Sequence, residues 1–376
     1  MPRCVHFPLC SGCQLDLTGD SPPVWKEVLE KYKHVANPDI IAGPLTQWRC
    51  RAKLAVQDIQ STRGIGLYRA HTHQVIPIPH CLIHHPQINE AVSMVSEWIN
   101  ENPISIYNET TGQGELRYIQ CVIERKTAKV QLSFVLNGAI TNDPLLKNWA
   151  DRLMNFLEIT GKERWHSLWL NLNEGKTNTI LSDHWCKLWG EELLWETLNQ
   201  TDVCYHPGSF GQANLDLFEI LLSRINAWVP HNSTVTELYA GVGAISLTLA
   251  SKCDWIRCEE WSRFAEGCFQ ASSLRLPPSI AKRLHFTTGS AETQLHLLEG
   301  ASTIIVDPPR KGLSLPVIQK INSSQSQQLI YVSCGWSSFQ RDCAVLVQAG
   351  WTLKDLQGFS FFPGTHHIEL LTRFER

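Results

Sequence analysis

Short apolar runs alternate with longer amphipathic segments through the second half of the chain. The runs that predict strands are residues 234–239, 255–258, 284–287, 303–306, 328–332 and 351–356. The segments between them are long enough for crossover helices, and strands that alternate with helices form parallel sheets. The pattern therefore predicts a doubly wound, mostly parallel α/β sheet that continues to the end of the chain.

The first half of the chain has a different pattern, in which apolar and polar residues alternate one by one. Residues 118–124, 129–136 and 167–173 show it most clearly. Such alternation is typical of antiparallel sheets with one face toward a core, so this half is expected to be a separate α+β domain. A turn at residues 205–208 precedes a helix expected from about Asn214, which places the boundary near residue 204 and predicts domains 1–204 and 205–376.

The composition is that of an ordinary globular protein with room for two cores: 376 residues, 43% hydrophobic and 18% charged. The net charge of −3 excludes a protein that is basic throughout, so any nucleic-acid surface must be a local patch. No run approaches the roughly 18 apolar residues of a membrane span, and no apolar leader follows Met1, so we expect a cytoplasmic protein. Thirteen cysteines without a secretion signal favour metal or catalytic roles over disulfides.

A glycine turn follows the first strand of the predicted parallel sheet. Gly241 and Gly243 allow the backbone to approach a ligand closely, although an ordinary strand-to-helix turn would look the same. The preceding carboxylate, Glu237, suits the ammonium of S-adenosyl-L-methionine (SAM) better than it suits a pyrophosphate. Glu259 lies at the end of the next strand, where an acid accepts hydrogen bonds from ribose hydroxyls, and Glu260 is the alternative.

Two further strands end in residues that can do chemistry. Asp307 is followed by two prolines and by Arg310, where methyltransferases that act on amino groups carry an aromatic residue. Cys334 follows the next strand and so reaches the same edge of the sheet. A cysteine there is a candidate thiolate nucleophile, and the alternative is a buried structural thiol.

Four motifs resemble those of the RNA uracil-C5 methyltransferase family and stand in the family order. They are Ser-Phe-Gly-Gln-Ala-Asn at 209–214, Asp-Pro-Pro-Arg-Lys-Gly at 307–312, Val-Ser-Cys at 332–334 and Gly-Thr-His-His-Ile-Glu at 364–369. The resemblance implies a Rossmann-like, SAM-dependent methyltransferase domain in residues 205–376. It also implies SAM contacts from Gln212, Tyr239, Gly241, Gly243, Glu259, Ser290 and Asp307.

The same resemblance implies a covalent mechanism, because C5 of uracil is too weak a nucleophile to attack SAM unaided. The Cys334 thiolate adds to C6, C5 takes the methyl group, Glu369 removes the C5 proton, and elimination releases Cys334. The sequence departs from the family pattern after the nucleophile, where Gly335 and Trp336 replace Asn-Pro. Ala244 and Tyr239 are further departures, and losing the Asn affects contacts to the target uracil.

The N-terminal cysteines form a second constellation. Cys4, Cys10 and Cys13 have the spacing C-x5-C-x2-C, and Cys81 is a distant fourth. Four thiolates suit either zinc or a four-iron, four-sulfur (4Fe–4S) cluster, with nearby histidines as alternative zinc ligands. The resemblance is to the short bacterial branch that acts on 23S ribosomal RNA and lacks a TRAM domain, and it implies the iron–sulfur cluster. Its role would be structural, since methyl transfer is redox-neutral.

Basic and aromatic residues alternate in the segment that follows. Residues 48–53, Arg63, Tyr68 and Arg69 combine phosphate-binding side chains with stacking ones, as in an RNA surface. We expect a monomer that acts on 23S ribosomal RNA without a membrane or an obligate protein partner. The alternatives are the transfer-RNA branch of the family, which typically lacks the cluster cysteines, and a noncatalytic SAM-binding module that binds or folds RNA.

Overall fold

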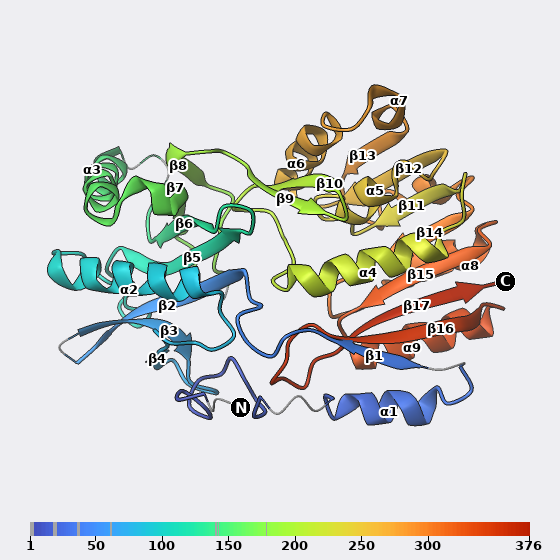
Figure 1. Cartoon of the computed structure of the whole chain (residues 1–376), viewed down its shortest axis with the longest axis horizontal. Coiled ribbons are helices and arrows are strands. Elements are labelled where there is room, and N and C mark those ends of the chain that lie inside the picture. The colour runs from blue at the N-terminus through green and yellow to red at the C-terminus, as the bar shows by residue number, and fades with distance from the viewer. Residues whose placement is uncertain are drawn as a thin grey trace. The chain divides into compact units, whose positions relative to one another are not determined.

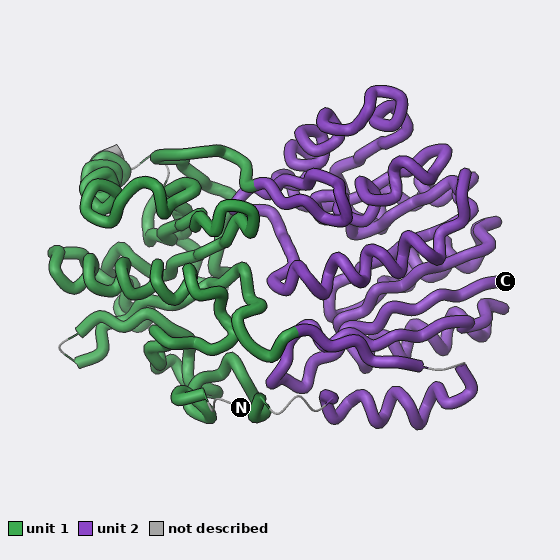
Figure 2. The backbone as a smooth tube through the Cα atoms, in the orientation of Figure 1, with its two compact units in different colours: residues 1–18, 44–194 green, residues 19–43, 195–376 purple. Residues whose placement is uncertain are grey.

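The computed structural model of the protein describes residues 4–17, 21–35, 38–60, 62–139, 141, 143–177 and 179–376. The chain divides into two compact units, shown in Figure 2. Unit 1 comprises residues 1–18 and 44–194, and unit 2 comprises residues 19–43 and 195–376. The predicted limits of 1–204 and 205–376 differ from these units at two places: residues 19–43 and residues 195–204 both belong to unit 2.

Burial of apolar side chains explains why the early segment belongs to unit 2. Helix α1 (Val24–Lys31) buries Trp25 and Val28 in the core of that unit. Strand β1 (Asp39–Ala42) pairs in parallel with β16 (Thr352–Ser360) at the edge of its sheet. A sequence pattern read along the chain does not detect such a return, because β1 has only four residues.

The described residues of unit 2 form an eight-stranded sheet in the order β1-β16-β17-β15-β14-β11-β12-β13. The strands after β1 are β11 (Thr234–Leu238), β12 (Trp255–Glu260), β13 (Leu284–Thr288), β14 (Thr303–Val306), β15 (Gln328–Ser333), β16 and β17 (Glu369–Glu375). The six predicted strands are all present, and the mostly parallel α/β sheet is confirmed. The last strand, β17, was not predicted; it runs antiparallel between β15 and β16.

Helices cover this sheet (Figure 1): α4 (Leu215–Trp228), α5 (Ala244–Leu249), α6 (Arg263–Ser273), α7 (Pro278–Ala281), η2 (Leu295–Leu298), α8 (Leu315–Ser323) and α9 (Trp336–Gln348). Helix α4 begins where the sequence predicted it, and the Asn214 side chain caps it by accepting a hydrogen bond from the Leu217 N–H at 3.3 Å. Helices α1, α8 and α9 share one core cluster with strands β14 and β15. The short pair β9 (Leu194–Leu198) and β10 (Thr201–Tyr205) packs on α6, where the Cys204 N–H donates to Ser272.

The described residues of unit 1 form a seven-stranded sheet in the order β4-β3-β2-β5-β6-β7-β8. Its elements are β2 (Arg51–Ile59), β3 (Thr62–Tyr68), β4 (Val75–Pro77), α2 (Pro86–Glu101), β5 (Leu116–Glu124), β6 (Lys129–Leu136), α3 (Asp143–Thr160), η1 (Lys162–Arg164), β7 (Trp165–Leu172) and β8 (Trp185–Gly190). Neighbouring strands are antiparallel except β6 and β7, which are parallel because the helix α3 connects them. The sequence pattern predicted β5, β6 and β7, but it predicted neither the other four strands nor the parallel pairing of β6 with β7.

Aromatic side chains fill the core between this sheet and its helices. Trp98 of α2 contacts the ring of Phe134 at 5.9 Å between centroids, and it contacts Phe156 of α3 at 5.2 Å. Such edge-on aromatic packing adds stability beyond the area buried. In the part of the chain that is described, no helix has the length and apolar character needed to cross a membrane.

Candidate active site

The carboxyl ends of the central strands of unit 2 meet at one edge of the sheet and border a cavity of about 730 Å³. Parallel sheets bind ligands at this edge, beside the strand where the order reverses, which here is β11 between β12 and β14. Eight of the predicted site residues line the cavity: Gln212, Tyr239, Gly241, Glu259, Ser290, Asp307, Cys334 and Glu369. Residues that are distant in sequence and were predicted separately are therefore brought together.

The two glycines of the turn after β11 have different roles. Gly241 lines the cavity, has a positive φ of 56° and leaves open space where a side chain would begin. Gly243 has φ 78°, and a Cβ atom there would lie 2.3 Å from the ring of Phe269. It is absent from the cavity lining, and its predicted contact with the cofactor stays a prediction. Gly243 is also the left-handed cap that lets α5 pack against α6.

Glu237 is buried at the end of β11 and also lines the cavity. Its carboxylate accepts hydrogen bonds from the backbone N–H of Ser246 at 3.0 Å and from the Ser246 hydroxyl. Burial raises the pKa of Glu237 to about 8, and the Ser246 hydroxyl opposes that rise. A buried carboxyl group with such a pKa is neutral for much of the time at neutral pH, and a cation in the cavity would favour its ionised form.

The two acids at the end of β12 both line the cavity. Glu259 accepts a hydrogen bond from the Tyr239 N–H at 3.3 Å, and burial raises its pKa to about 7. Glu260 accepts from the Gly241 N–H at 3.0 Å and from the Ser262 N–H at 2.8 Å. Glu260 therefore fixes the glycine turn directly, and both acids remain candidates for the ribose contact.

Cys334, Asp307 and Glu369 all line the cavity and lie close enough for their charges to affect one another. Burial raises the pKa of the Cys334 thiol to about 12, the charges of Glu369 and Asp307 add to the rise, and Arg310 opposes it. Burial likewise raises the pKa of Asp307 to about 7 and that of Glu369 well above its ordinary value. The cavity thus concentrates carboxyl groups that share little positive charge. A cationic ligand would lower all of these pKa values at once.

Gly335 and Trp336, which depart from the family pattern, hold the turn after Cys334 in place. A Cβ atom on Gly335 would lie 2.6 Å from the carbonyl oxygen of Arg310, so the turn sits directly on the loop after β14. Ser338 donates a hydrogen bond to that same oxygen at 2.8 Å. The Trp336 ring contacts Tyr32 and Phe339. The departure is therefore accommodated by packing behind Cys334.

Two exposed aromatic residues of the cavity were not predicted from the sequence. Phe210 and Trp261 line it although they are 68% and 75% exposed. Large exposed rings beside a cavity are available for stacking on a nucleobase or adenine ring. Phe210 lies inside the family motif at residues 209–214, and Trp261 directly follows the two acids of β12. Their positions were visible in the sequence, but their exposure was not.

The four N-terminal cysteines meet in unit 1. Cys4, Cys10, Cys13 and Cys81 line one cavity of about 170 Å³, together with Arg49. Burial raises the pKa of Cys13 to about 12, and the other three thiols add to that rise. Among the described residues, no group of three or more His, Cys, Asp or Glu side chains is arranged to hold a single metal ion.

Part of the predicted RNA surface has a structural role instead. Trp48 is only 4% exposed and cannot stack on a base. Arg63 donates hydrogen bonds to the carbonyl oxygens of Ile99 and Asn102, where α2 ends. Arg49 lines the cysteine cavity. These three residues therefore have contacts within unit 1 that the local sequence did not suggest.

The strand order, the glycine turn and the acidic cavity define a SAM-dependent methyltransferase. A sequence model of the family described as tRNA (Uracil-5-)-methyltransferase matches residues 282–375. An uncharacterized RNA methyltransferase of Protochlamydia amoebophila is 47% identical over 373 residues, which cover 99% of this chain and 97% of that protein. Another from Caldanaerobacter subterraneus is 30% identical and covers 100% and 84%. The chain belongs to the RNA uracil-5-methyltransferase family.

A solved structure shares the fold. It is the tRNA (uracil-54, C5)-methyltransferase of Pyrococcus abyssi in complex with S-adenosyl-L-homocysteine. The TM-score is 0.76 with 24% sequence identity, over 98% of this chain and 86% of that chain. The likeness supports the Rossmann-like architecture that the sequence motifs implied.

Proposed function

We propose that the protein transfers a methyl group from SAM to C5 of a uridine in 23S ribosomal RNA and so forms 5-methyluridine. Cys334 is the nucleophile and Glu369 is the proton acceptor. The observation that carries the proposal is that Cys334, Asp307 and Glu369 line the same cavity as the glycine turn. Family membership supports the chemistry, and the cavity supports the assignment of residues.

The residues of the cavity can perform each step. The Cys334 thiolate forms a bond to C6, and the electron pair of the C5–C6 double bond makes C5 nucleophilic. SAM supplies the methyl group when it is bound: the bond from its sulfur to the methyl carbon breaks as the bond to C5 forms, and S-adenosyl-L-homocysteine leaves. Glu369 then takes the C5 proton, the C5–C6 double bond re-forms, and the bond to sulfur breaks. Every atom is accounted for, and the thiolate is regenerated.

The raised pKa of Cys334 supports an ordered reaction. A thiol with a pKa of about 12 is almost wholly protonated in the free protein at neutral pH. Arg310 already favours the thiolate, and the sulfonium of bound SAM would add positive charge to the cavity. The nucleophile would therefore be activated only once the methyl donor is in place.

Residues around the glycine turn would hold SAM. Gln212, Tyr239, Gly241, Ser290 and Asp307 line the cavity on which the proposal rests. Glu259 is the proposed ribose ligand, and its neighbour Glu260 is the alternative. Single changes of each acid to Gln distinguish them. The change at the acid that binds the ribose should raise the dissociation constant for SAM more than the change at the other acid.

We also propose that Cys4, Cys10, Cys13 and Cys81 hold a 4Fe–4S cluster. The donor set fits, since four thiols line one cavity. Each thiolate of such a cluster binds a different iron, so the four sulfurs lie farther apart than around one zinc ion. The lack, among the described residues, of a group arranged for a single ion is compatible with that spacing. The cluster would hold the N-terminal residues onto unit 1.

The RNA target has two candidates. The four cysteines resemble those of the family branch that acts on 23S ribosomal RNA, and so they support that target. The description of the matching family model instead favours transfer RNA. Incubation of the protein with labelled SAM and unmodified transcripts of both RNAs distinguishes them. We expect label in 23S RNA, lost in Cys334→Ser and kept in Cys186→Ser, a half-buried cysteine outside both sites. Label in transfer RNA alone would replace the target, and no label in either would favour a noncatalytic SAM-binding module.

A further inference from the structure

Unit 1 contains a second large cavity, of about 410 Å³, away from the cysteines. Residues of β2, of β3 and of the loop before β5 line it. The chain has seven tyrosines, and the three that lie in unit 1, Tyr68, Tyr107 and Tyr118, all line this cavity. Each of the three rings is only partly buried. Such a concentration of amphipathic rings is typical of a surface that stacks on flat ligands.

An arginine fixes one wall of this cavity. The Arg117 guanidinium lies over the ring of Tyr107, 4.6 Å from its centroid, and the residue is only 6% exposed. It donates hydrogen bonds to the carbonyl oxygens of Asn173 at 2.5 Å and Gly175 at 2.9 Å. Its Nε atom is buried and has no hydrogen-bond partner among the described residues. The stacked pair is therefore rigid, and it includes a buried donor of the kind that ligands satisfy.

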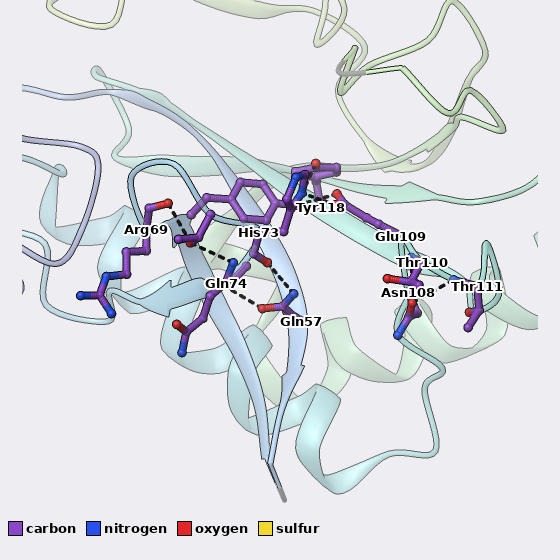
Figure 3. Close-up of polar contacts among 12 residues, drawn as sticks. Gln57, Arg69, His73, Gln74, Asn108, Glu109, Thr110, Thr111 and Tyr118 are labelled. Atoms are coloured by element: carbon purple, nitrogen blue, oxygen red, sulfur yellow. Dashed lines mark hydrogen bonds and ion pairs between the residues drawn. The ribbon is translucent and has the colours of Figure 1, made fainter.

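A network of hydrogen bonds joins other residues of the cavity lining (Figure 3). The carboxylate of Glu109 accepts from the Tyr68 hydroxyl at 2.8 Å and contacts Nδ1 of His73 at 2.9 Å. The hydroxyls of Tyr68 and Tyr118 lie 3.1 Å apart. Gln57 donates to the carbonyl oxygen of His73 at 2.9 Å. Glu109 is thus held in position although its residue is exposed.

The loop that carries Glu109 is itself fixed. The Asn108 side chain accepts hydrogen bonds from the backbone N–H groups of Thr110 and Thr111, at 2.9 Å and 3.1 Å (Figure 3). The Asn108 N–H also donates to the carbonyl oxygen of Gln113 at 2.8 Å. Asn favours such turns because its side chain bonds the backbone two residues on. The cavity is therefore preorganised, which lowers the entropic cost of binding.

The charges around the cavity determine what it can bind. Asp58 and Glu109 both line it. The guanidinium of Arg117 also lines it but is held by the Tyr107 ring and two carbonyl oxygens, so we expect the two carboxylates to repel a phosphate. Carboxylate oxygens instead accept hydrogen bonds from the amino groups of adenine, cytosine or guanine, whereas uracil lacks an amino group. The volume falls within the roughly 300–1,000 Å³ of small-ligand sites. We infer that this cavity binds an unstacked, amino-bearing base of the RNA substrate, an inference that rests on the proposed function in taking RNA as the substrate.

The arginine on the neighbouring strand end complements this arrangement. Arg69 follows β3 directly and is exposed, and Figure 3 shows its side chain extending away from Tyr118 and Glu109. A guanidinium in that position can contact the phosphate backbone while the base occupies the cavity. A pocket that stacks on a base, with a basic side chain beside it for the phosphate backbone, is an arrangement that proteins use to bind single-stranded RNA.

Binding of short labelled oligoribonucleotides to the full chain tests the inference. We expect oligoadenylate and oligocytidylate to bind more tightly than oligouridylate. Tyr107→Ala should weaken oligoadenylate binding about tenfold, as loss of one stacking contact does. Glu109→Gln should remove the preference over oligouridylate, because the neutral amide loses one acceptor. Glu158→Gln, an exposed acid on α3, is the matched control and should change nothing.

Equal affinities for the parent and both cavity variants, or no preference against oligouridylate in the parent, would overturn the inference. Glu109→Gln preserves the size of the side chain, so the test stands even if Tyr107→Ala does not fold. Oligonucleotide binding requires no methyl transfer. An inactive protein can therefore show this base preference, and an active enzyme can lack it, so the inference and the proposed function fail separately.

Discussion

The indole N–H of Trp336 donates a hydrogen bond to the carboxylate of Glu27 at 2.9 Å. Trp336 begins α9 two residues after Cys334, the proposed nucleophile, and Glu27 lies in the first turn of α1. The Trp336 ring also meets Tyr32 edge-on, with 6.0 Å between centroids. The segment around α1 is therefore attached directly behind the turn that presents Cys334. This attachment occupies the position where the family has Asn-Pro.

Replacing Trp336 with Ala should lower both stability and the rate of methyl transfer. The side chain is only partly buried, so we expect a loss of about 2 kcal/mol in the free energy of unfolding. The turn around Cys334 would lose its support, so kcat should fall while the affinity for SAM is kept. Urea unfolding and steady-state kinetics measure the two effects. Trp261→Ala, which removes a 75% exposed ring, is the control for stability and should lie within about 0.5 kcal/mol of the parent.

The two glycines of the cofactor turn should respond differently to the same change. Gly243→Ala places a methyl group against Phe269 at a positive φ, and should cost about 3 kcal/mol of stability. Gly241→Ala meets no neighbouring atom, so only the left-handed backbone penalty of about 1–2 kcal/mol applies. Because Gly241 lines the cavity, its variant should nevertheless bind SAM more weakly. Equal losses of stability in the two variants would show that the packing of α5 on α6 is not what requires Gly243.

Binding of SAM should release protons near neutral pH. In the free protein, the raised pKa values of Asp307 and Glu259, about 7, and of Glu237, about 8, leave these groups partly protonated. A bound cation lowers these pKa values, so affinity should increase as the pH rises from about 6 to about 8. Calorimetry in buffers of different ionisation enthalpy counts the protons released. S-adenosylhomocysteine, which lacks the sulfonium charge, should show a weaker pH dependence, and an affinity for SAM that is independent of pH would refute this electrostatic account.

The sign of the corresponding stability effect follows from the same groups. A carboxyl group whose pKa is higher in the folded state than in the unfolded chain binds its proton more tightly when folded. Its contribution to stability is present below the unfolded pKa of about 4 and is lost as the pH rises through the folded value. The ligand-free protein should therefore lose stability between about pH 5 and 8, and SAM should restore part of it.

Cys81→Ser should remove the proposed cluster without affecting the catalytic cavity, because these two sites lie in different units. We expect the parent to be brown with absorbance near 400 nm and the variant to lose both colour and iron. Metal analysis of the purified protein distinguishes iron from zinc. A colourless parent that contains one equivalent of zinc would refute the iron–sulfur assignment, whatever its activity.

The sequence predicted the catalytic sheet well because each strand there has its own apolar run and its own polar end. The cavity is lined by residues at those strand ends. The sequence alone therefore predicts that Asp307 and Cys334 reach the same edge of the sheet. The short β1 and the antiparallel β17 were missed. Both strands are fixed by their pairing with β16, which a local sequence pattern does not reveal. The packing role of Gly243 was missed for a related reason: a side chain at this position would meet Phe269, which lies on a different helix.

In unit 1, the sequence identified the right segments but not the roles of their side chains. Arg63 and Trp48 looked like RNA contacts, yet one bonds the end of α2 and the other is buried. The cavity around Tyr107 and Glu109 was not predicted, since its residues come from several separate segments with no common motif. Side chains that converge from several elements produce sites that only the folded chain reveals.

Trapping of a covalent complex tests the central claim most directly. Glu369→Gln keeps the shape of the side chain but removes the base, so the reaction should stop after methyl transfer with RNA still bonded to Cys334. Incubation of this variant with SAM and unmodified 23S ribosomal RNA should give an adduct that survives denaturation and migrates with the protein in a gel. The adduct should be absent when Cys334 is also changed to Ala. If Glu369→Gln forms no adduct and methylates RNA as fast as the parent, Glu369 is not the base and the proposed mechanism is wrong.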